Sequence, residues 1–82
     1  MENLLQELTC IFREVFGDDN IQINRKTTAD DIEQWDSLTH IEMIVAVEKQ
    51  FNIRFQSLDL KKLNNVGDLE DIVKQKIAAW IW

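Results

Sequence analysis

The fold is decided by residues 35–53, which read WDSLTHIEMIVAVEKQFNI. Apolar residues recur in this stretch with the spacing of an α-helix and cover a wide arc of its surface. They are Leu38, Ile41, Ile44, Val45, Val47 and Phe51. Asp36 is a good N-cap, because its carboxylate can accept hydrogen bonds from the free N–H groups of the first turn. We therefore predict a central helix that neighbours contact on several sides, with a narrow solvent-facing strip at Thr39, Glu42, Ala46, Lys49 and Gln50.

A second helical pattern precedes this stretch. Residues 4–16 carry an apolar stripe with helical spacing, and Gly17 follows as a candidate C-cap. Cys10 falls on the far side of that helix from the stripe, where we expect an incidental surface cysteine. The sequence thus predicts an amphipathic first helix.

Two more helical patterns follow it. Ser57 can cap a short helix that carries Leu58, Leu60 and Leu63. Asn65 marks the start of a final helix, with apolar residues on one face. The end of the chain, Trp80-Ile81-Trp82, is unusually apolar. We expect it to pack on the first helix, and a partner-binding patch is the alternative.

The segment between the first two helices contains no long periodic pattern. Thr28 followed by Asp31 forms a weak capping box that can start one helical turn. Ile21-Gln22-Ile23 could instead pair with residues 51–55, and an α+β fold is therefore the runner-up. We predict an all-α fold in a single domain, residues 1–82: a four-helix bundle of three longer helices and one short helix, with a long loop between helices 1 and 2.

Composition and charge exclude several classes of function. The 82 residues include nine Lys/Arg and fifteen Asp/Glu, giving a net charge of −6, and 45% are hydrophobic. A chain this small leaves little room for an enzyme cleft. Its negative charge argues against binding nucleic acid or anionic lipid, and no stretch is long and apolar enough for membrane insertion. One cysteine excludes an internal disulfide and indicates a reducing, cytoplasmic compartment. Residues 1–35 hold eight acids and three bases, so a basic partner should approach there or near the middle of the chain.

Most candidate metal sites in the sequence lack the required ligand types or the required spacing. Residues 18–23 begin like a calcium loop, but Ile23 and Ala29 stand where such a loop needs Gly and Glu. One Cys and one His do not make a zinc site. The acids at Asp30, Asp31 and Glu33 are ordinary solvated charges at the start of a helical turn. We therefore expect no metal.

Ser37 is the residue that the sequence singles out. A Ser37–His40 pair lacks an orienting acid, oxyanion donors and a pocket, so we do not predict an enzyme. Ser37 does fall on the first helical residue after the Asp36 cap. Its hydroxyl can point outward there, where free N–H groups and the helix dipole would stabilise an attached phosphate.

In these residues the chain resembles the acyl carrier protein family. The match consists of residues 35–53, with Asp-Ser-Leu at 36–38 and a Phe-x-Ile at 51–53, and of Val66-Gly67-Asp68-Leu69 at the start of the last helix. With the first helix and the loop, the resemblance covers about residues 3–80. It implies a helical bundle without catalysis of its own.

The resemblance also implies a prosthetic group. A phosphopantetheinyl transferase would use coenzyme A and Mg²⁺ to attach 4′-phosphopantetheine to Ser37, which Asp36 and Leu38 flank, and the terminal thiol of the arm would hold acyl groups as thioesters. In this family, acyl chains can enter between the helices. The matching pocket residues would be Leu38, Ile41, Val45, Val47 and Leu63, for which plain core packing is the alternative.

Partner enzymes are implied in the same way. Acyl-loading and acyl-using enzymes of this family often present basic patches to acids, here matched by Asp36, Glu42 and Glu48. Lys49, Gln50 and His40 depart from that acidic pattern. We expect a stand-alone monomeric acyl carrier of a fatty-acid-like, polyketide or other secondary pathway. One alternative is an aminoacyl or peptidyl carrier, although the Gly-Gly pair typical of such carriers is replaced here by Gln34-Trp35. The other alternative is a non-catalytic helical interaction module.

Overall fold

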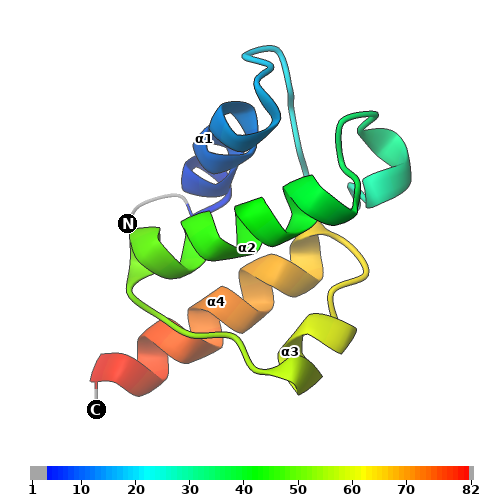
Figure 1. Ribbon diagram of the computed structural model, residues 1–82. Helices are drawn as coiled ribbons and strands as arrows, with labels where there is room; N and C mark the ends of the chain where they lie inside the picture. Colours follow the sequence, from blue (N-terminus) through cyan, green and yellow to red (C-terminus); the bar gives the residue numbers. More distant parts are fainter. Residues whose placement is uncertain (1–3, 82) are drawn as a thin grey trace.

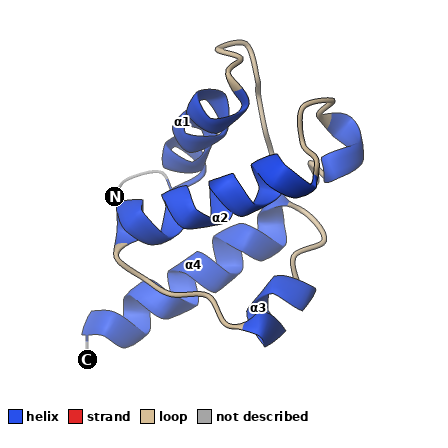
Figure 2. Cartoon of the chain, viewed as in Figure 1, coloured by secondary structure: helices blue, strands red, loops and turns tan. Residues whose placement is uncertain are grey.

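The computed structural model describes the backbone of residues 4–81 and the side chains of residues 4–78. Its elements are the helices α1 (Leu4–Phe16), α2 (Ser37–Phe51), α3 (Ser57–Lys61) and α4 (Val66–Ile81), with a 3₁₀ turn, η1 (Ala29–Asp31), between α1 and α2 (Figure 1). Over residues 4–81 the chain forms no strand (Figure 2). The predicted all-α bundle of three longer helices and one short one is confirmed, and the α+β alternative is wrong.

The core is formed where the three long helices meet. Leu8 and Phe12 of α1, Met43 and Val47 of α2, and Val73 of α4 are almost completely buried. α1 packs against both α2 and α4. None of the described helices is long and apolar enough to cross a membrane.

The long segment between α1 and α2 is part of the packed structure. It buries Ile21, Ile23 and Ile32 in the core. Thr28 and Asp31 form the predicted capping box, with the Thr28 N–H donating to Asp31 Oδ2 at 2.9 Å. The single turn expected from this pair is confirmed as η1.

Two backbone hydrogen bonds join this segment to the start of α4. The Val66 N–H donates to the Thr27 carbonyl and the Gly67 N–H to the Arg25 carbonyl, both at 2.9 Å. A Cβ built on Gly67 would lie 2.9 Å from the Arg25 carbonyl oxygen. Only a residue without a side chain therefore permits this close approach.

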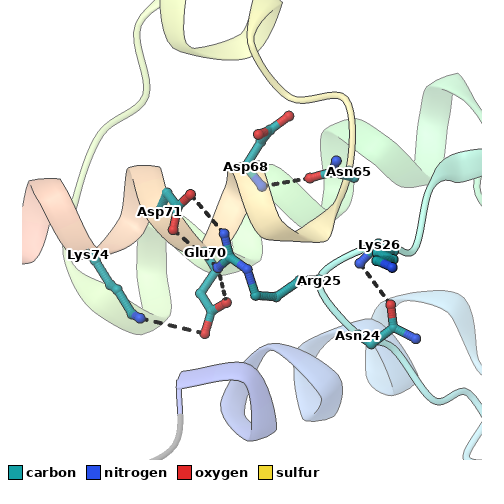
Figure 3. Close-up of polar contacts among 8 residues, drawn as sticks. All are labelled: Asn24, Arg25, Lys26, Asn65, Asp68, Glu70, Asp71 and Lys74. Atoms are coloured by element: carbon teal, nitrogen blue, oxygen red, sulfur yellow. Dashed lines mark hydrogen bonds and ion pairs between the residues drawn. The ribbon is translucent and has the colours of Figure 1, made fainter.

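The Arg25 side chain strengthens the same junction, as Figure 3 shows. Its guanidinium contacts Glu70 at 2.6 Å and binds both carboxylate oxygens of Asp71, at 3.1 and 2.9 Å. The second carboxylate oxygen of Glu70 lies 3.9 Å from Lys74 Nζ. The hydrogen bond from Arg25 lowers the pKa of Asp71, so this carboxylate stays ionised at neutral pH.

The surroundings of α2 differ from the prediction. Leu38, Ile41 and Val45 are 65%, 61% and 41% exposed, whereas Met43, which the predicted arc omitted, is 1% exposed. The helix therefore packs on one side and presents a second apolar face to solvent. The predicted apolar arc is therefore only partly covered: Ile44 and Val47 are buried, but the face with Leu38, Ile41 and Val45 has no covering neighbour among the described residues. Apolar spacing alone does not say which of two apolar faces is covered.

The structure also corrects details at the C-terminal side. Gln56, not Ser57, is the N-cap of α3, and the helix ends before Leu63. Asn52 ends α2 in the left-handed conformation, and residues 53–56 connect it to α3, with Ile53 buried and Arg54 exposed. Cys10 is exposed, as predicted. The side chains of Trp80-Ile81-Trp82 lie outside the described residues.

Candidate functional site

Ser37 is the first residue of α2, and the residue before it caps the helix. Asp36 has extended backbone, and its Oδ1 accepts hydrogen bonds from the Leu38 and Thr39 N–H groups, both at 3.0 Å. In return, the Asp36 N–H donates to Thr39 Oγ1 at 2.8 Å. This reciprocal pair is a capping box, and it fixes the turn that carries Ser37.

The cap also sets the charge beside Ser37. The backbone and hydroxyl hydrogen bonds from Thr39, followed by the Leu38 N–H, lower the pKa of Asp36. Its carboxylate is thus ionised at neutral pH. The Thr39 hydroxyl further donates to the Gln34 carbonyl at 2.7 Å, tying the preceding loop to the helix. Sequence reasoning placed Thr39 on the solvent strip and missed this role, although its spacing of three residues from Asp36 was an available signal.

An aromatic cluster lies behind the same turn. The Trp35 ring meets Phe12 edge-on, with ring centroids 5.2 Å apart, and Phe16 at 5.9 Å. Trp35 Nε1–H donates to His40 Nδ1 at 3.0 Å. Trp35 therefore anchors the turn before Ser37 to α1, and no sequence pattern predicted its contact with His40.

This geometry also explains why His40 does not activate Ser37. A neutral imidazole that accepts at Nδ1 carries its proton at Nε2, so neither ring nitrogen is free to take the Ser37 proton. Burial lowers the pKa of His40, which favours the neutral ring. The Ser37 hydroxyl makes no hydrogen bond to another described residue. The pair is not a nucleophile–base pair.

A shallow depression opens beside Ser37. It is lined by Ala29, Trp35, Asp36, Ser37, His40 and Ile41. Ser37 itself is exposed. The depression could receive the first atoms of a flexible group attached to the hydroxyl, and it is too open to enclose a substrate.

The surroundings of Ser37 fit an attached phosphodiester. The hydroxyl is accessible and lies at the positive end of the α2 dipole, which stabilises an anion. One expectation needs correction: the N–H groups of Leu38 and Thr39 are not free for the phosphate, since the Asp36 carboxylate already accepts from both. The α2 dipole and the Ser37 N–H remain available to stabilise the phosphate. Among the described residues, no cluster of His, Cys, Asp and Glu could hold a metal ion.

The structure separates the five residues expected to line an acyl pocket. Leu38, Ile41 and Val45 lie on the exposed face of α2, whereas Val47 is fully buried in the core. Leu63 follows α3 and packs against the core from the outside. The five side chains therefore do not surround one cavity in this structure.

The three acids expected to meet partner enzymes are also placed differently. Asp36 caps α2, and Glu42 is exposed without an ion pair to a described residue. The Glu48 carboxylate accepts a hydrogen bond from the Phe55 N–H at 2.9 Å and is partly buried. Glu48 thus holds the connector after α2, a role that the sequence did not indicate.

Comparison with known proteins gives the family. A family model described as "Phosphopantetheine attachment site" matches residues 6–73. The chain is 34% identical over 73 residues to an acyl carrier protein of Acidothermus cellulolyticus, covering 88% of this chain and 86% of that one. It is 25% identical over 77 residues to an acyl carrier protein of Thermotoga maritima, covering 94% and 95%. The solution structure of a holo acyl carrier protein from Geobacter metallireducens matches with a TM-score of 0.91 at 49% identity, covering 95% of this chain and 90% of that one.

These matches extend over almost the whole bundle, including the turn that presents Ser37. The chain belongs to the phosphopantetheine-binding acyl carrier protein family. Its prosthetic group is phosphopantetheine, and it is a carrier without catalytic activity of its own.

Proposed function

We propose that Ser37 is the attachment residue, and that the protein presents acyl groups to enzymes of a fatty-acid-like, polyketide or other secondary pathway. The observation that carries the proposal is the position of Ser37: an exposed hydroxyl on the first residue of α2, held by the Asp36–Thr39 capping box. The only other serine, Ser57, begins the five-residue helix α3.

In the attachment of phosphopantetheine, this chain would supply the Ser37 hydroxyl and the transferase would supply the base. The Ser37 oxygen would bond to the pantetheine-side phosphorus of coenzyme A, the bond to the nucleotide phosphate would break, and the serine proton would leave through the transferase. Since His40 has no free acceptor, the base must come from the transferase. Once bound, the group supplies a thiol that holds acyl chains as thioesters. The chain itself keeps the attachment turn rigid and accessible.

Such a carrier needs no tight binding site for its cargo. Covalent tethering raises the effective concentration of the acyl group at each enzyme, so brief and weak docking is sufficient. This fits a bundle whose depression beside Ser37 is shallow and open. We further propose that the carrier acts as a monomer in the cytoplasm, which is consistent with its single, unpaired cysteine.

Intact mass spectrometry tests the attachment. The apo protein is incubated with coenzyme A, Mg²⁺ and a broad-range phosphopantetheinyl transferase. We expect the mass to increase by one phosphopantetheine in the native chain and in the Ser57→Ala control, and to stay unchanged in Ser37→Ala. An increase in Ser37→Ala, or none in the native chain with several transferases, would refute the proposal. Loading of the holo protein with acyl groups but not with amino acids would separate an acyl carrier from a peptidyl carrier.

A further inference from the structure

The exposed face of α2 forms a continuous stripe that the core does not use. Leu38, Ile41 and Val45 follow one another at helical spacing, and Lys49 lies one turn beyond Val45 on the same side. Glu42 borders the stripe and is exposed as well. Three large apolar side chains in a row on a helix surface are typical of a protein-binding face.

The charged residues of α2 and of the segment that follows it change sign after residue 48. From residue 36 to 48 the charged residues are all acidic. From residue 49 to 62 four are basic and one is acidic. The four bases are exposed: Lys49, Arg54, Lys61 and Lys62. Residues 49–62 thus carry excess positive charge in a chain of net charge −6.

Asp59 and the neighbouring Glu48 have partners within the chain, whereas the four bases have none among the described carboxylates. The Asp59 carboxylate lies 2.8 Å from Lys76 Nζ of α4, and the Glu48 carboxylate accepts from the Phe55 N–H. None of the four bases forms an ion pair with a described carboxylate. Leu58 and Leu60 of α3 are exposed as well. Lys49, one turn beyond Val45, therefore presents an unpaired positive charge beside the exposed apolar side chains of α2.

We propose that the partner enzymes of this carrier bind the stripe in an apolar socket whose far border is acidic and faces Lys49. This proposal rests on the proposed carrier function and names the chemistry of its partner. It is the reverse of the purely basic patch that the resemblance implied. Only the end near Ser37, where Glu42 is exposed, would meet a base on the enzyme.

The two charges on the stripe would also set the direction of docking. Glu42 and Lys49 are seven residues apart, which corresponds to about 10 Å along the helix axis. A partner with a cation near its active-site entrance and a carboxylate about 10 Å away can bind α2 in one direction only. That direction places Ser37 at the entrance. Binding in the opposite direction would bring like charges together.

The test uses the acyl-loading and acyl-transferring enzymes encoded in the protein's own genome, each purified. For each enzyme the KM of the holo protein and the Kd of the Ser37→Ala protein are measured, in the native background and in Lys49→Glu. The matched control is Lys26→Glu. It makes the same charge change at an exposed lysine in the loop beside the start of α4 (Figure 3).

We expect Lys49→Glu to raise KM and Kd about 5- to 10-fold for the partner enzymes at low salt, because an attraction is replaced by a repulsion. Lys26→Glu should change them less than about 2-fold. At about 1 M salt, where the screening length is roughly 3 Å, the difference between the two variants should disappear.

Several results would overturn the proposal. One is an equal effect of the two variants on every enzyme, and another is tighter binding of Lys49→Glu. A third is light scattering that shows a dimer for the native chain and a monomer for Lys49→Glu, which would mean that the stripe is the contact between two copies of this chain. Both variants must first gain phosphopantetheine in the mass assay. If the native chain gains none, the carrier function itself has failed; if all gain it and the KM values agree, only the docking proposal has failed.

Discussion

Gly67 gives the sharpest test of how the long loop is held against α4. Gly67→Ala adds a Cβ that would lie 2.9 Å from the Arg25 carbonyl oxygen and 3.2 Å from Asn65 Oδ1. The first contact is with backbone, which cannot rotate away, and the same carbonyl accepts the Gly67 N–H. Overpacking of this kind costs about 1–3 kcal/mol. The higher helix propensity of Ala returns at most about 1 kcal/mol.

We therefore expect Gly67→Ala to lower the free energy of unfolding by about 1–2 kcal/mol, which corresponds to a Tm lower by about 4–15 °C in a domain of this size. Urea unfolding followed by circular dichroism measures the change. Gly17→Ala is the control, because Gly17 has a φ of 68° and no atom within 4 Å, so its cost comes from the backbone alone. Hydrogen exchange at the amides of Val66 and Gly67 should accelerate only in Gly67→Ala. Unchanged or increased stability of Gly67→Ala would refute the close-approach argument.

Two further predictions concern other contacts. Burial lowers the pKa of His40, so the unfolded chain binds more protons than the folded one as the pH falls below about 6.5. Stability should be constant above that pH and decrease below it, and His40→Phe should flatten this part of the profile. A urea midpoint that stays the same from neutral pH down to the pH at which carboxylates begin to titrate would contradict the burial of His40. Asp59 and Lys76 join α3 to α4 at 2.8 Å with about a fifth of each side chain exposed. A double-mutant cycle with Asp59→Asn and Lys76→Met should give a coupling of about 0.5–1 kcal/mol, and a coupling of zero would show that this ion pair does not hold α3.

The helices and their caps could be predicted because their causes are local in the sequence. Apolar residues at helical spacing indicated α1, α2 and α4, and Asp36 was identified as the cap of α2. The Thr28–Asp31 capping box was predicted from a spacing of three residues and is confirmed. The position of Ser37 on the first residue of α2 follows from the same local rule.

The remaining features depend on contacts between distant residues. Periodicity identified both apolar faces of α2 but could not show that Val47 is buried in the core while Leu38 is exposed to solvent. Glu48 matched an acidic partner contact in the sequence, whereas its carboxylate holds the Phe55 N–H. The contacts of Arg25 with α4 join residues 45 and 46 positions apart, and no local pattern reports such a pairing.

The junction between Arg25 and α4 also bears on the entropy of the chain. It closes a ring of about 45 residues, which contains the second part of the segment between α1 and α2, together with α2 and α3. The entropic cost of closing a flexible ring grows only with the logarithm of its length, by about 0.6 kcal/mol for each doubling. The length of the segment between α1 and α2 therefore adds very little to the entropic cost of folding. The segment leading to Ser37 is long enough that its conformation is set by its own caps and aromatic contacts, and not by the distance between the two helix ends that it joins.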